Sequence, residues 1–116
     1  MPNPNIPDVI QNDLSPTVTI GETIYMTEGN SATINANLVP GSGLLDGTTD
    51  FEWYYKGERV FDDVAEGGRF SISTTPTGTS LTINDVTLSD VGQIQVIGYN
   101  PAGSDRAFTD LNGKYR

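Results

Sequence analysis

The chain has 116 residues, 35% of them hydrophobic, and its 15 acidic side chains outnumber six basic ones to give a formal net charge of −9. Because all six basic residues lie at or after Lys56, no segment gathers the positive charge that phosphate contacts require, so we expect no nucleic acid partner. Cysteine and histidine are absent, which excludes disulfides and thiolate metal sites and removes the usual general base, zinc ligand and pH switch.

The length and the residue types favour one all-β domain. A second core would leave each half near the size at which folding alone becomes marginal. Small polar residues and glycine are abundant, and β-branched residues cluster in short runs. No stretch approaches a membrane span, so we expect no membrane insertion. The first ten residues lack the basic and apolar regions of a secretion signal, so we expect synthesis in a cytoplasm.

Residues 1–16 are predicted to form an extended N-terminal arm ahead of a domain over residues 17–116. The segment MPNPNIPDVIQNDLSP contains four prolines, which fix φ and remove backbone donors. We expect the arm either to dock on the domain or on a partner, or to be an unattached terminus. The apolar side chains available for docking are Ile6, Val9, Ile10 and Leu14.

Period-two alternation predicts a series of short strands. The first is broken by a turn at residues 21–22, and the clearest is residues 31–38, where Ala32, Ile34, Ala36 and Leu38 share one face. Residues 51–56 alternate as well and point Trp53 inward as the expected packing centre. Four further strands are expected at residues 69–73, 80–85, 93–99 and 106–111. Seven or eight short strands separated by turns indicate a sandwich or a barrel.

The order of these segments resembles that of an intermediate-set (I-set) immunoglobulin domain. The segments that carry the resemblance are EGNSATINA at 28–36, WYYKGERV at 53–60, RFSI at 69–72, SLTINDV at 80–86, SDVGQIQV at 89–96 and GYNPAG at 98–103. The match covers about residues 17–112. It implies an immunoglobulin-like β-sandwich of seven to eight strands.

The resemblance places the two cysteines of the family at Ala36 and Val96, and so implies that the bridge between the sheets is absent. Such a bridge commonly stabilises a domain by about 2 to 4 kcal/mol. We expect Ala36 and Val96 to pack against Trp53 instead. Because disulfides persist in oxidising compartments, their absence favours assembly in a reducing cell interior.

Ile94 stands where the family has the tyrosine that ties down the corner before the sixth strand. An isoleucine fills space but makes no hydrogen bond. Asp90 and Gly92 of the corner motif remain, and the resemblance implies that Asp90 pairs with Arg69. We interpret all of these residues as structural.

No set of residues indicates an enzyme or a cofactor site. Serine and threonine are plentiful, but no histidine is present to activate them. The carboxylates Asp62, Asp63 and Glu66 match no calcium-loop spacing and are interpreted as solvated side chains of a turn. We therefore expect a non-enzymatic protein without a metal.

An aromatic surface is the strongest candidate for a contact site. If Trp53, Ile94 and Val96 point inward, then alternation turns Tyr54, Ile97 and Tyr99 outward, together with Phe108 of the last strand. The alternative is that the arm or ordinary cross-strand pairing covers these side chains.

These features favour a structural or binding protein of a virion, displayed on the capsid of a tailed bacteriophage as a decoration protein. The chain is similar to the immunoglobulin-like domains of phage virion proteins in being acidic, free of cysteine and without a secretion signal. The expected partner is the capsid or another virion protein, with a host surface as a further candidate. The alternative is a module of a bacterial cell-surface protein or adhesin that binds carbohydrate or protein. The sequence does not specify the oligomeric state.

Overall fold

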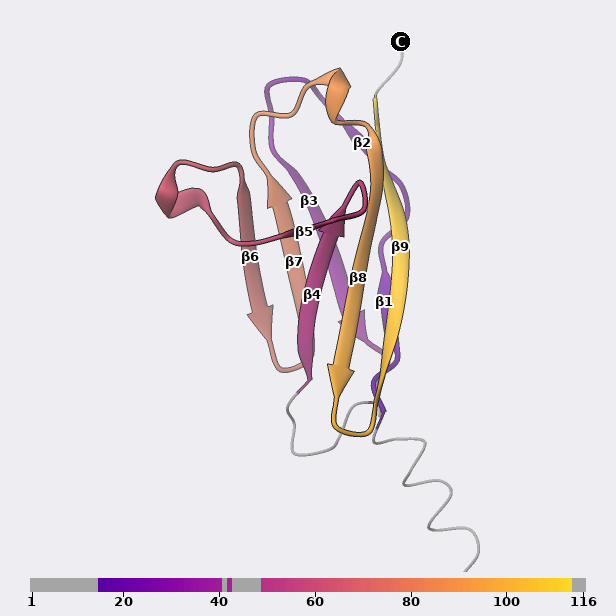
Figure 1. Ribbon diagram of the computed structural model, residues 1–116. Coiled ribbons are helices and arrows are strands. Elements are labelled where there is room, and N and C mark those ends of the chain that lie inside the picture. Colours follow the sequence, from indigo (N-terminus) through magenta and orange to yellow (C-terminus); the bar gives the residue numbers. More distant parts are fainter. Residues whose placement is uncertain (1–14, 41, 43–48, 114–116) are drawn as a thin grey trace, which may run out of the picture.

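The computed structural model describes residues 15–40, 42 and 49–113, which form two β-sheets packed face to face (Figure 1). One sheet has the strand order β1-β3-β7-β6 and the other β2-β9-β8-β4-β5. The strands of the first sheet are β1 (Val18–Ile20), β3 (Ala32–Leu38), β7 (Gly78–Ile83) and β6 (Phe70–Thr75). Those of the second are β2 (Ile24–Met26), β9 (Gly103–Gly113), β8 (Gly92–Asn100), β4 (Asp50–Tyr55) and β5 (Glu58–Val60).

The described residues contain nine strands, where the sequence predicts seven or eight. The broken first strand becomes two strands in different sheets. β1 pairs antiparallel with β3, whereas β2 pairs parallel with β9, with Ile24 opposite Leu111. The other additional strand is the three-residue β5, which pairs with β4 across a turn at Lys56 and Gly57, both with positive φ.

The core between the two sheets is formed by the side chains that point inward from alternate positions of the strands. Along β3 the inward residues Ala32, Ile34 and Ala36 are buried, Ile34 completely, whereas Leu38 at the end of the strand is half-buried. Trp53 of β4 is 1% exposed and is among the largest fully buried side chains. The remaining buried apolar residues are Val18, Met26, Ala36, Val60, Leu81, Ile83, Val86, Ile94, Val96 and Leu111. The sequence-predicted all-β sandwich is therefore the fold of the protein.

Ser15, Pro16 and Val18 contact the rest of the domain. The Ser15 hydroxyl donates a hydrogen bond to the main-chain oxygen of Ala102, Pro16 is buried, and the Val18 N–H donates to the carboxylate of Asp105 at 2.8 Å. The predicted docking residues of the arm, Ile6, Val9, Ile10 and Leu14, lie outside the described residues.

Candidate interaction surface

A tryptophan and a hydrogen bond occupy the region where the family's disulfide would join the sheets. Ala36, Trp53 and Val96 are at most 1% exposed and belong to one core cluster. Val96 lies opposite Trp53 in one sheet, and Ala36 lies opposite Thr79 in the other. The indole Nε1 of Trp53 donates a buried hydrogen bond of 3.0 Å to Thr79 Oγ1. This bond, worth about 1 kcal/mol net, links the two sheets directly beside the positions of the absent cysteines.

Arg69 and Asp90 form an ion pair at the corner before β8. The guanidinium donates to both carboxylate oxygens of Asp90, with 3.1 Å from Nη1 to Oδ1, and its Nε donates to the main-chain oxygen of Asn84. The N–H of Thr87 also donates to Asp90, which closes a capping box on η3 (Leu88–Asp90). The bond from Arg69 holds the pKa of Asp90 below its usual value, although burial opposes this shift. The same bond raises the pKa of Arg69.

Tyr55 supplies the corner hydroxyl that position 94 lacks. Tyr55 lies directly opposite Ile94 in the pairing of β4 with β8. Its hydroxyl donates a short hydrogen bond to the main-chain oxygen of Asp90, while Ile94 is completely buried. Burial, and then the negative charge of Asp90, raise the pKa of Tyr55 from 10.0 to about 12, so that the hydroxyl keeps its proton to a more alkaline pH than an ordinary tyrosine does.

Gly92 gives the Lys56 side chain the space to reach the same corner. A Cβ at position 92 would lie 2.7 Å from Cγ of Lys56. The Lys56 ammonium donates to the main-chain oxygen of Ser89 at 2.8 Å and lies 5.4 Å from the centre of the Tyr55 ring. Arg69, Asp90 and Gly92, which the resemblance assigns to the corner, thus lie together there and contact one another or their neighbours.

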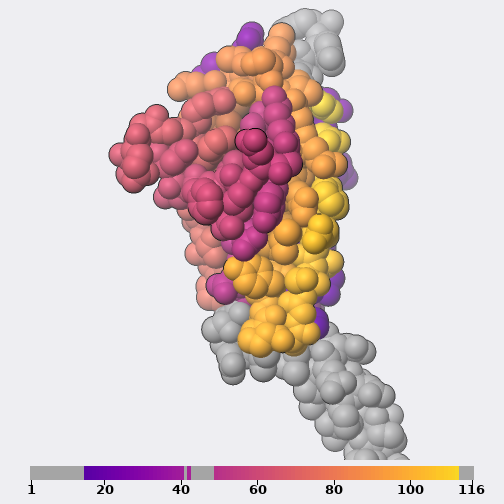
Figure 2. Space-filling view, viewed as in Figure 1, coloured from indigo at the N-terminus to yellow at the C-terminus, as the bar shows by residue number. Residues whose placement is uncertain are grey.

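The outer face of the five-stranded sheet is the candidate interaction surface. It is turned toward the viewer in Figure 2. The strand register places all four predicted residues on it, in three adjacent rows. The rows are Tyr54, Gln95 and Phe108; then Glu52, Ile97 and Arg106; then Asp50, Tyr99 and Ser104.

The aromatic side chains on this face are separated by charged and polar side chains. Phe108 is 49% exposed and Tyr99 is 36% exposed, whereas Tyr54 and Ile97 are half-buried. The Tyr54 hydroxyl donates to Glu52 at 3.0 Å, and Glu52 forms a 3.5 Å ion pair with Arg59 of β5. The face is therefore a mixed surface, on which the predicted aromatic residues are accompanied by polar side chains and by the ion pair of Glu52 with Arg59.

Two exposed aromatic residues were not among those predicted. Tyr25 of β2 is 62% exposed and lies opposite Asn112, which extends the outer face beyond β9. Phe61 is 61% exposed beside β5, with the Arg59 guanidinium 4.6 Å from its ring centre. Alternation predicts that Tyr25 and Phe61 point outward, because their neighbours Met26 and Val60 point inward. The three-residue strands are too short for that signal to be distinct.

A groove of about 460 Å³ opens at the edge of the sandwich between β5 and β6. Phe61 and Arg59 line one part of it, and the half-buried rings of Tyr55 and Phe70, packed edge to face, line another. The β5–β6 connection stands out at this side of the molecule in Figures 1 and 2. The groove joins the outer face at Arg59.

Asp62 and Asp63 cover the exposed edge of β6, and are not merely solvated as the sequence suggests. Asp63 accepts a hydrogen bond from the N–H of Phe70 at 2.8 Å, and Asp62 accepts one from the N–H of Ile72 at 3.0 Å. These N–H groups would otherwise be free to pair with another strand. The two carboxylates thus block an open sheet edge.

Among residues 15–40, 42 and 49–113, no group of three or more His, Cys, Asp or Glu side chains is arranged to hold a metal ion. In the same part of the chain, no helix has the length and apolar character to cross a membrane.

The chain belongs to the immunoglobulin I-set domain family, which matches residues 17–112. Domains with this immunoglobulin-like fold are typically protein-binding or structural modules and are generally not enzymes. No curated protein sequence matches the chain.

Solved structures with the same fold include domains and fragments of titin, Dscam1 and twitchin. The titin domain M4 aligns with a TM-score of 0.71 and 17% identity over 88% of this chain and 98% of that chain. The Ig7 domain of Dscam1, isoform 5, aligns with a TM-score of 0.70 and 18% identity over 88% of this chain and 99% of that chain. The twitchin kinase region of C. elegans aligns with a TM-score of 0.71 and 18% identity over 90% of this chain but only 17% of that chain. At these identities the likeness establishes the fold alone.

Proposed function

We propose that this protein is a non-enzymatic docking module that binds another protein through the outer face of its five-stranded sheet. The observation that carries the proposal is the register of β4, β8 and β9. This register places exposed Phe108 and Tyr99 in the rows on either side of the row that contains Arg106, and β2 adds Tyr25 to the same face. Tyrosine, phenylalanine and arginine are enriched at protein interfaces, and tyrosine and arginine among the residues that dominate binding.

The charges on this face favour a protein partner of mixed charge. Arg59 and Arg106 stand among acidic side chains, and Glu52 already pairs with Arg59. Partial burial, and then the negative charge of Glu52, raise the pKa of Tyr99 above its ordinary value, so its hydroxyl is a hydrogen-bond donor over the whole neutral pH range. A partner with a complementary pattern would gain orientation and association rate from these groups.

In its finer form, the proposal is that the partner is a capsid and that the protein decorates the shell of a tailed bacteriophage. This setting rests on the analogy with immunoglobulin-like domains of phage virion proteins, together with the acidic composition and a sandwich that needs no disulfide. The alternative setting, a bacterial cell-surface module, would use the same face for a different protein. In either setting the arm, with Ile6, Val9, Ile10 and Leu14, is a second proposed contact.

The test mixes the purified protein with undecorated capsid shells and, separately, with host cells, and measures co-sedimentation. We expect the wild type to bind shells and Phe108→Asp to lose at least about tenfold in affinity, as hot-spot residues do. The matched control is Ser73→Asp, because Ser73 is also exposed but belongs to the other sheet.

Each part of the proposal has its own contrary result. Absence of wild-type binding to shells rejects the capsid partner, and binding to cells alone supports the alternative setting. Equal binding by the Phe108→Asp and Ser73→Asp variants rejects the five-stranded face. Full binding after deletion of residues 1–14 removes the arm from the anchor role.

A further inference from the structure

The two sheets differ sharply in charge. No residue of β1, β3, β6 or β7 is charged, although the chain has a net charge of −9. Solvated sheet faces normally carry charged side chains, which keep proteins soluble and apart. The strands of the five-stranded sheet do carry them, at Asp50, Glu52, Glu58, Arg59, Asp105, Arg106 and Asp110.

The outer face of the four-stranded sheet is a regular array of hydroxyl and amide side chains. The strand register aligns them in three rows across the sheet. The rows are Thr19, Asn37, Gly78 and Thr75; then Asn35, Ser80 and Ser73; then Thr33, Thr82 and Ser71. No side chain in this array is aromatic or larger than asparagine, so the face is flat, polar and neutral.

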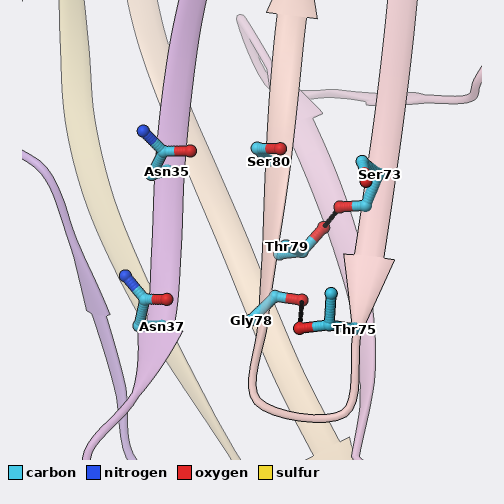
Figure 3. Close-up of a pocket in the computed structure, with 7 residues that line it drawn as sticks. All are labelled: Asn35, Asn37, Ser73, Thr75, Gly78, Thr79 and Ser80. Carbon is cyan, nitrogen blue, oxygen red and sulfur yellow. Dashed lines mark hydrogen bonds between the residues drawn. The ribbon is translucent and has the colours of Figure 1, made fainter.

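A shallow hollow of about 170 Å³ lies in the first two rows (Figure 3). Gly78 forms part of its lining, where a Cβ would come within 2.7 Å of Asn37 Oδ1 and 2.8 Å of the Ala36 oxygen. The side chains of Asn35 and Asn37 border the hollow from β3, and those of Ser73 and Thr75 border it from β6. The hollow therefore has polar groups on two opposite sides.

Among the described residues, none takes up the hydrogen-bonding groups of the two asparagine amides in the hollow. Thr33 and Thr82 bond to each other at 2.9 Å, and Thr75 bonds to the main-chain oxygen of Gly78. Within the described part of the chain, the side-chain amides of Asn35 and Asn37 make no hydrogen bond, and Figure 3 shows none between them and the other lining residues. Each amide offers two donors and an acceptor oxygen with two lone pairs.

We propose that this face, which we call the neutral face, binds neutral carbohydrate, with Asn35 and Asn37 as the principal contacts. Paired donors and acceptors on one amide match the hydroxyl groups of a sugar, which both donate and accept. The net charge of −9 and the lack of a cationic residue in the four strands β1, β3, β6 and β7 disfavour an anionic glycan. A protein partner is disfavoured because the neutral face has no aromatic or arginine anchor.

The same geometry sets the strength of the interaction. A shallow, water-exposed hollow without an aromatic platform buries little ligand surface, so we expect a dissociation constant in the millimolar range for one site. Many copies on one particle would raise the avidity well above this value. The proposal is independent of the proposed docking function, because the neutral face lies on the opposite side of the sandwich.

The test follows NMR signals of the isolated protein during titration with maltohexaose, cellohexaose and chitohexaose. The side-chain amide signals of Asn35 and Asn37 report binding in the wild type, and the main-chain amide signals of Gly78 and Ser80, which line the hollow, report binding in the wild type and in every variant. We expect saturable shifts of the Asn35 and Asn37 signals with at least one of these probes, and none with polygalacturonate. The variant Asn35→Asp/Asn37→Asp is expected to weaken binding about tenfold or more. Gln93→Glu is the matched control, because it adds the same type of charge on the outer face of the other sheet.

Unchanged main-chain signals of the core residues show that the variants are folded. The proposal is overturned if none of the three neutral probes shifts the two amides at concentrations of several millimolar. It is also overturned if the double variant binds as tightly as the control. Binding to shells in the preceding experiment would be unaffected by either result, so the two proposals fail separately.

Discussion

Replacing Tyr55 by phenylalanine removes a single hydroxyl and tests whether Tyr55 takes over the role of the missing corner tyrosine. The ring, which packs against Phe70 and against the core, is retained. The lost interaction is the hydrogen bond to the main-chain oxygen of Asp90. A typical bond contributes about 0.5 to 1.5 kcal/mol, and a buried acceptor left without its partner adds to that loss. We therefore expect Tyr55→Phe to lower the free energy of unfolding by about 1 to 2 kcal/mol.

The assay is urea denaturation with linear extrapolation, in which the midpoint falls while the slope m is unchanged. In a domain of this size the same loss lowers Tm by roughly 4 to 8 °C per kcal/mol. Tyr54→Phe is the matched control, because it removes a hydroxyl from the adjacent residue on the outer face, where the bond to Glu52 is partly open to water. The control should change stability by less than about 0.5 kcal/mol.

The pH dependence supplies a second readout. The pKa of Tyr55 is about 12 in the folded protein and 10.0 in the unfolded chain. The stabilisation by the protonated hydroxyl is therefore fully present below pH 10 and is lost as the pH rises through about 12. Tyr55→Phe should lack this component of the alkaline loss. A stability within about 0.3 kcal/mol of the wild type, with the same alkaline profile, would refute the role of Tyr55 at the corner.

Three further substitutions test other parts of the structure. Arg69→Ala should lower the free energy of unfolding by about 2 kcal/mol, which is less than for a fully buried ion pair because the guanidinium is partly exposed to water. Shell binding by the folded fraction of this variant should be unchanged. Because the pKa of Asp90 is lowered in the folded protein, the difference between this variant and the wild type should shrink as the pH falls below the ordinary carboxyl range. Thr79→Val should lower the free energy of unfolding by about 1 to 3 kcal/mol in urea titrations, since it leaves the buried indole N–H of Trp53 unpaired; no loss would show that the bond is dispensable. Asp63→Ala should increase the rate of aggregation measured by light scattering, because it uncovers an N–H on the β6 edge, and a rate equal to that of the wild type would contradict the edge-blocking role.

The core and the fold class could be predicted from the sequence because they depend on local pattern. Alternation along residues 32–38 and 51–55 is a property of neighbouring residues, and it identified the buried faces and Trp53 before any strand was paired. Periodicity alone leaves a sandwich and a barrel as alternatives, and the order of the motifs favours the sandwich of one family. Strand β5 and the division of the first strand between sheets were less accessible, because three-residue strands carry little periodic signal.

The candidate surfaces depend on which strands become neighbours, and this only the tertiary structure decided. Tyr55 replaces the corner tyrosine because it pairs opposite Ile94, on a strand nearly forty positions earlier. Asp62 covers the open edge of β6 because the connection before this strand folds back along the edge. The neutral face exists because β1, β3, β7 and β6, which each lack charged residues, belong to the same sheet. Local periodicity determines which side of a strand is buried, whereas long-range pairing determines which exposed side chains form a surface together.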